Sequence, residues 1–155
     1  MPTMTDTDPA DPKVLVDLRL PPDPSSPARA RHALNPLENR FDEETLFKLR
    51  LLVSELVTNS VRHARLEEGD LIWVRILCER GALRVEVLDS GWGFPTPRAA
   101  LPYAGWELQR AEQERDWPGG WGLNLVERLA DSWGIVRDDG TTVWFEVNVA
   151  GSCRP

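Results

Sequence analysis

The chain has 155 residues, a formal net charge of −7 and a pI near 4.9, so it is long enough for one domain with a hydrophobic core. An acidic chain is poorly suited to neutralising phosphates, and no apolar run reaches membrane-spanning length, so direct nucleic-acid binding and membrane insertion are not expected. No signal-like N-terminus is present, and Cys78 and Cys153 are far apart. A cytoplasmic protein with two reduced thiols is therefore expected.

The N-terminal third predicts a tail, a strand and a short helix. Residues 1–12 are rich in Pro, Thr and Asp and are predicted to be disordered. Apolar residues alternate over 13–20, which indicates a strand. A serine pair followed by Pro27 is typical of a helix start, and Pro36 limits that helix.

The longest periodic segment runs from Asp42, a predicted N-cap, to about Arg65. Glu55 and Asn59 are four residues apart and share one helix face, which Arg62 continues by one turn. Taken alone, this pair is more typical of a solvated stripe on an amphipathic helix. The positions expected to face the core are Leu46, Leu49, Val53, Leu56 and Ser60.

Gly69 ends the helical segment, and two hairpins follow it. Four strands are predicted at residues 71–79, 82–88, 133–136 and 141–149. A helix is expected from Leu123 to about Ser132, and 150–155 is a second tail. Residues 94–118 contain several prolines and are predicted to be a lid or a disordered segment. The fold class expected is an α+β two-layer sandwich over 13–149, with a mixed, mostly antiparallel sheet and helices on one face.

Two glycine motifs accompany the polar helix face. Asp89 ends a strand, where its carboxylate can accept a hydrogen bond from an amino group, and Gly91 and Gly93 would let the backbone approach a flat ligand. Gly120 and Gly122 open a helix, whose free N–H groups can bind phosphate. Each motif alone is weak evidence. Their order along the chain, with the asparagine-bearing helix before them, favours a nucleotide site.

These segments resemble the boxes of the Bergerat-type (GHKL) ATP-binding fold shared by gyrase and histidine kinases. Residues 55–64 resemble its N box, 89–93 its G1 box, 120–123 its G2 box, and 140–144 its last strand motif. Within this superfamily the chain resembles the anti-sigma-factor serine/threonine kinases, in E-L-V-T-N-x-V-R-H-A and in G-L-x-L-V-x-x-L-A-D-x-W-G. The resemblance covers about 13–149.

The resemblance implies ATP and Mg²⁺ as ligands and gives roles to the residues of the N and G1 boxes. Asn59 resembles the Mg²⁺ ligand, and Glu55 resembles the general base that takes a proton from an attacking hydroxyl. Arg62 occupies the place of a basic residue facing phosphate. Asp89 resembles the acceptor of the adenine amino group, and in its box Gly93 resembles the glycine beneath the base.

The later boxes carry further implied contacts. Gly120, Gly122 and Leu123 belong to the phosphate-cradling hinge of the lid, and Thr142 is expected to reach adenine through water. Trp121 departs from the arginine that the subgroup commonly carries between the two glycines. Arg110 or Arg115 in the lid could substitute for that arginine.

The resemblance implies a regulatory protein kinase that transfers the ATP γ-phosphate to a serine or threonine of an antagonist protein, sequesters a sigma factor, or does both. The departure at Trp121 leaves an alternative open, a catalytically weak or inactive nucleotide-binding switch that acts only by protein binding. A scaffold without nucleotide would leave the glycine motifs without a purpose. A homodimer is left open, and no direct nucleic-acid or membrane partner is expected.

Overall fold

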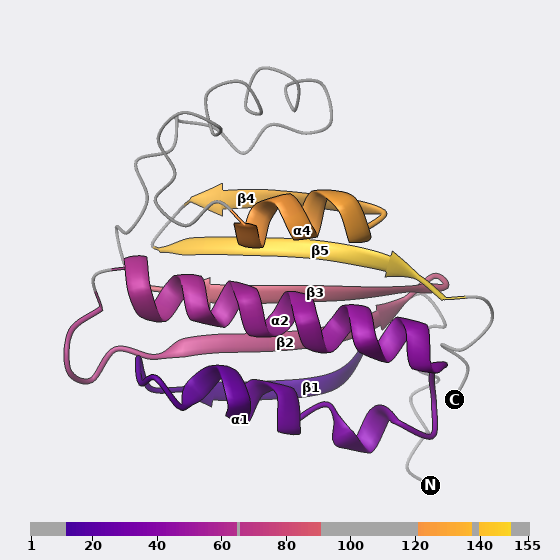
Figure 1. Ribbon diagram of the computed structural model, residues 1–155, viewed down its shortest axis with the longest axis horizontal. Helices are drawn as coiled ribbons and strands as arrows, with labels where there is room; N and C mark the ends of the chain where they lie inside the picture. The colour runs from indigo at the N-terminus through magenta and orange to yellow at the C-terminus, as the bar shows by residue number, and fades with distance from the viewer. Residues whose placement is uncertain (1–11, 65, 91–120, 138–139, 150–155) are drawn as a thin grey trace, which may run out of the picture.

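The structure is a computed structural model that describes residues 12–64, 66–90, 121–137 and 140–149. The predicted lid and nearly all of both predicted tails lie outside the described residues. None of the helices in the described part of the chain combines the length and apolar character that a membrane span requires. The elements, in order, are β1 (Lys13–Leu20), α1 (Ser26–His32), a 3-10 helix (Asn35–Leu37), α2 (Glu43–His63), β2 (Ile72–Glu79), β3 (Ala82–Asp89), α4 (Trp121–Leu129), β4 (Ser132–Arg137) and β5 (Thr141–Asn148) (Figure 1).

The five strands form one sheet in the order β1-β2-β3-β5-β4, and α1, α2 and α4 lie over one of its faces (Figure 1). The α+β two-layer sandwich predicted from the sequence is confirmed. One detail of the prediction differs. The sheet was expected to be mixed, but all four strand pairings between the described strands are antiparallel. β4 runs in the same direction as β3, but β5 lies between them, so these two strands do not pair with each other.

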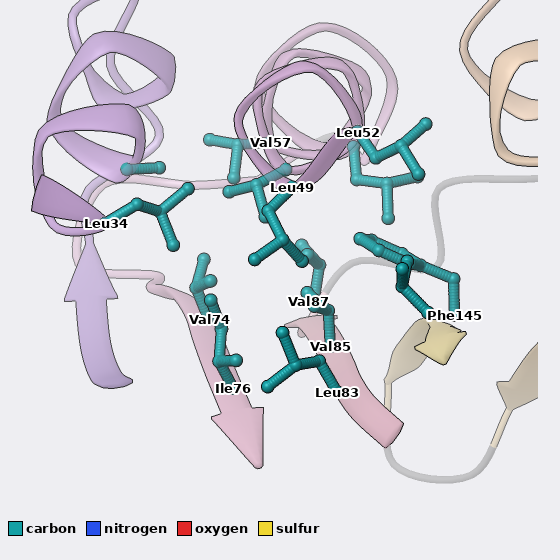
Figure 2. Packing of buried hydrophobic residues seen from close by; sticks show 14 of the residues in the cluster. Leu34, Leu49, Leu52, Val57, Val74, Ile76, Leu83, Val85, Val87 and Phe145 are labelled. Atoms are coloured by element: carbon teal, nitrogen blue, oxygen red, sulfur yellow. The ribbon is translucent and has the colours of Figure 1, made fainter. Parts of the chain in front are cut away.

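The core lies between α2 and the middle of the sheet. Figure 2 shows Leu49 and Leu52 of α2 facing strand residues such as Val85, with Phe145 of β5 beside them. The strands alternate between buried and partly exposed positions, as expected when one sheet face is covered. All five positions of α2 predicted to face inward are buried: Leu46, Leu49, Val53, Leu56 and Ser60.

Local interactions fix where several elements begin and end. The Asp42 carboxylate caps α2 by accepting a hydrogen bond from the Thr45 N–H at 2.8 Å, and this bond lowers the pKa of Asp42. β2 and β3 are joined by Arg80 and Gly81, with φ values of 47° and 80°. Two consecutive positive φ values are typical of the tight turns that match the twist of a hairpin. The Val149 N–H then donates to the Gly81 carbonyl at 2.8 Å.

Cys78 near the end of β2 differs from the sequence-based expectation. It is buried and disulfide-bonded, so the prediction of a reduced thiol at this position is wrong. The prediction rested on the spacing of the two cysteines along the chain, and spacing along the chain does not determine distance in the fold. Cys153 lies outside the described residues.

The sheet face opposite the helices carries charged and aromatic side chains. The Arg84 guanidinium donates to Glu86 at 2.9 Å and to Glu146 at 3.0 Å, and it lies 4.2 Å from the ring centroid of Trp144. Trp144 pairs across the strands with Gly134, where an added Cβ would be only 2.9 Å from three ring atoms. Gly134 therefore provides the space in which the Trp144 ring lies flat on β4.

Gly134→Ala should lower the free energy of unfolding by about 1–3 kcal/mol, because the methyl group would displace the Trp144 ring from beneath Arg84. The same substitution in a Trp144→Ala background should cost little, since the ring is gone and alanine suits a strand better than glycine. Urea denaturation followed by circular dichroism measures both differences. An equal loss in the two backgrounds would show that the ring does not determine the need for glycine.

Candidate functional site

Four segments meet at one end of the sheet, on the left in Figure 1: the end of α2, the end of β3, the start of β5 and the start of α4. β3 and β5 are antiparallel neighbours, so Asp89 at the end of β3 pairs with Thr141 at the start of β5. The carboxyl end of α2 lies over this edge, because Ser60 in its last turn reaches Asp89. Residues from distant parts of the sequence thus form one polar cluster.

The centre of this cluster is the buried Asp89 carboxylate. Asp89 is 2% exposed and accepts a hydrogen bond from the Ser60 hydroxyl, with Oγ and Oδ2 2.7 Å apart. Arg137, at the end of β4, is within electrostatic range: burial lowers the pKa of its guanidinium, while the charge of Asp89 raises it. A buried carboxylate that receives a donated hydrogen bond is well suited to accept another from a ligand amino group.

The backbone beside Asp89 is closely packed. A Cβ built on Gly140 would be 2.3 Å from the Asp89 carbonyl oxygen and 3.4 Å from the Ser90 Cα. Real side chains do not tolerate such distances, so glycine is required where the segment before β5 passes β3. This contact holds the main chain of Asp89 against the β4–β5 hairpin.

The strand register shows where the two threonines at the start of β5 lie relative to Asp89. Thr142 was expected near adenine, but it pairs with Leu88, and its side chain lies on the sheet face opposite the helices. Thr141 pairs with Asp89, is 2% exposed and faces the same side as the carboxylate. Side chains alternate strictly along a strand, so Thr141, and not Thr142, shares the sheet face of the Asp89 carboxylate.

The residues on the polar face of α2 differ in how deeply they are buried at this end of the molecule. Asn59 is 8% exposed, Glu55 one turn earlier is half-buried, and Arg62 is exposed. A solvated stripe would leave all three accessible, whereas here the amide is buried. Within the described part of the chain, the Asn59 side-chain nitrogen has no hydrogen-bond partner. A buried donor without a partner is destabilising unless a bound group satisfies it.

These residues fit a magnesium nucleotide. The buried Asn59 amide could donate its unsatisfied N–H to a phosphate oxygen, and amide oxygens are suitable ligands for Mg²⁺, which is commonly held by few protein groups together with substrate phosphates. Asp89 supplies an acceptor for an amino group on a base. Asn59 and Asp89 lie close to each other. Ser60, which follows Asn59 in α2, donates a hydrogen bond to Asp89 at the end of β3.

The structure covers only part of the predicted glycine motifs. Gly91, Gly93 and Gly120 lie outside the described residues, and Gly122 belongs to the first turn of α4. Leu123 is buried in the hydrophobic core, so its side chain anchors the start of α4. Trp121 is the first residue of the same helix.

Four residues of the cluster were not recognised as site residues from the sequence: Ser60, Arg137, Gly140 and Thr141. Ser60 was predicted to face the core, and a serine in an apolar stripe is a signal that a buried polar partner exists. Thr141 and Thr142 are neighbours, and choosing between them requires the register with β3. Nothing in the local sequence marks Arg137.

The sequence is similar to those of known proteins. Residues 20–147 match the histidine kinase-like ATPase domain family. The chain is 34% identical over 132 residues, 83% of each chain, to the serine-protein kinase RsbW of Listeria monocytogenes serotype 4a (strain HCC23). It is 33% identical, over 83% of each chain, to that of Listeria innocua serovar 6a, and 26% identical, over 87% of each, to that of Oceanobacillus iheyensis. The chain therefore belongs to the histidine kinase-like ATPase family and, within it, to the family of the RsbW serine-protein kinases.

Proposed function

We propose that the protein is an ATP-dependent serine/threonine protein kinase that phosphorylates an antagonist protein and sequesters a sigma factor. The observation that carries the proposal is the buried polar cluster at the end of α2, where Asn59 has an unsatisfied amide nitrogen and Ser60 contacts Asp89. The relatives named as serine-protein kinases support the same activity. Mg²⁺, when bound with ATP, would neutralise charge on the phosphates.

In this proposal the two ends of the cluster bind the two ends of the nucleotide. Asp89 accepts a hydrogen bond from the adenine amino group, with Thr141 beside it. Asn59 would hold the metal and contact the phosphates, and the exposed Arg62 would add positive charge at the rim. Backbone N–H groups at the start of α4, around Gly122, support the phosphates.

Phosphoryl transfer depends on positioning and charge neutralisation more than on covalent chemistry by the protein. The seryl or threonyl oxygen of the antagonist attacks the γ-phosphorus, and the bond from that phosphorus to the β–γ bridging oxygen breaks, so ADP leaves. Glu55 takes the proton of the attacking hydroxyl. Its half-buried position, one helical turn before Asn59, suits a group that must face both solvent and phosphate.

Glu55→Gln should keep ATP affinity within a few-fold of wild type and reduce phosphate transfer by roughly 10²-fold or more. The reason is that a general base acts in the transition state and contributes little to ground-state binding. Transfer of radiolabelled phosphate to a co-encoded antagonist, measured beside a binding isotherm, tests both values. A matched control is Glu43→Gln, an exposed glutamate in the first turn of the same helix, which should change neither.

Two outcomes separate the roles of Glu55. Parallel loss of affinity, stability and transfer would mean that the carboxylate holds the helix in place. Wild-type protein that binds ATP but transfers no phosphate would reject the kinase proposal and leave a nucleotide-dependent protein-binding switch.

Asn59→Ala should weaken the binding of Mg-ATP more than the binding of ATP without metal, because the variant loses the residue assigned to the metal and the phosphates. Asp89→Asn should weaken the binding of ATP to the same extent with and without Mg²⁺, because the contact assigned to Asp89 is to the base. Isothermal titration calorimetry with Mg²⁺ and with a chelator distinguishes the two patterns. Unchanged affinity in both variants would place the nucleotide elsewhere.

The proposed partners are an antagonist protein, as phosphate acceptor, and a sigma factor, with a homodimer as a further arrangement to be examined. The net charge of −7 disfavours direct contact with nucleic acid. A cytoplasmic location is proposed, because ATP and the transcription machinery are found there.

A further inference from the structure

Ser60 lies in the middle of the candidate site, yet it belongs to none of the roles assigned above. It is 4% exposed, and its hydroxyl donates to Asp89 Oδ2 at 2.7 Å. The bond joins the last turn of α2 to the end of β3. Both partners are more than nine-tenths buried, so water is a poor competitor for either of them.

The hydrogen bond constrains the chemistry of Asp89. A serine hydroxyl has one proton, and here that proton is directed at the carboxylate. Donation to a carboxylate favours its ionised form, and an ionised carboxylate can only accept hydrogen bonds. Such a group attracts an amino group at position 6 of a purine and repels a carbonyl oxygen at the same position.

The backbone and the side chain of Asp89 are held by different contacts. Antiparallel pairing with Thr141 and the close approach of Gly140 fix the main chain. The side-chain torsions set the direction of the carboxylate, and Ser60 is a buried donor that favours one of its orientations. Loss of the hydroxyl would leave the backbone in place and the carboxylate less well oriented.

We propose that Ser60 is a specificity-determining positioning residue for the purine base, which acts by orienting the Asp89 carboxylate toward the 6-amino group. This inference rests on the proposed function, since it assumes that the cluster binds an adenine nucleotide. It assigns base selectivity to α2, in which Asn59, the residue before Ser60, is assigned to the phosphates.

The test compares ATP with purine riboside triphosphate, which has hydrogen in place of the 6-amino group. Wild-type protein should bind ATP at least about 10-fold more tightly than the analogue. Ser60→Ala should lose about 10-fold in ATP affinity and stay within about 2-fold of wild type for the analogue, because the lost bond concerns only the amino contact. The ratio of the two dissociation constants is the readout, measured by competition with a fluorescent nucleotide.

A matched control is available on the same helix. Ser54 is also buried, and its hydroxyl accepts a hydrogen bond from Arg31 of α1 rather than contacting Asp89. Ser54→Ala should leave the ratio unchanged even if it lowers stability. Should Ser60→Ala fail to fold, Ser60→Cys keeps a side chain of similar size with a weak donor and should show the same reduced ratio.

If Ser60→Ala leaves the ratio unchanged, so that the affinities for ATP and for the analogue fall equally or not at all, the inference is overturned and the kinase proposal stays intact. A wild-type protein that prefers ATP but transfers no phosphate would reject the kinase proposal without affecting the role of Ser60. A wild-type protein that binds both nucleotides equally would reject Asp89 as the reader of the amino group, and the role of Ser60 with it.

Discussion

The packing of α2 against the middle of the sheet is the constraint on which both the core and the site depend. One face of this helix buries Leu49, Leu52 and Val53 against the strands, and the same rotation of the helix carries Asn59 and Ser60 inward at its last turns. Burial removes water from these polar groups, so each needs a partner. Ser60 finds Asp89, and the Asn59 amide nitrogen has none among the described residues. The helix that completes the core therefore also leaves a polar group available to a ligand.

The second constraint is the register between β3 and β5. It places the end of one strand beside the start of another that is about fifty residues further along the chain, so Asp89, Thr141 and Gly140 become neighbours. A shift by one residue would turn Thr141 away from the helices and Thr142 toward them. Close packing at Gly140 opposes such a shift, because any side chain there would collide with the carbonyl of Asp89. The site thus inherits its geometry from the sheet.

The sequence was most informative where structure is determined locally. The apolar spacing of α2, the cap at Asp42 and the short gap between the strands predicted at 71–79 and 82–88 indicated elements that the structure contains, because each depends on residues within a few positions. Features that depend on distant pairing were harder to predict. The choice between Thr141 and Thr142 requires the register, the all-antiparallel sheet requires knowing that β5 separates β3 from β4, and the bonding of Cys78 requires a spatial neighbour.

The strand order has a consequence for the sequence of events during folding. β2 and β3 are joined by a two-residue turn, so their pairing is local and involves little loss of chain entropy. β3 and β5 can pair only after a loop of about fifty residues has closed, which makes this contact entropically more demanding. Since Asp89 meets Thr141 in that pairing, the proposed nucleotide pocket is complete only when this long-range contact of the sheet has formed. A ligand that binds there recognises the finished fold and shifts the folding equilibrium toward it, by about 2.7 kcal/mol at a concentration 100 times its dissociation constant.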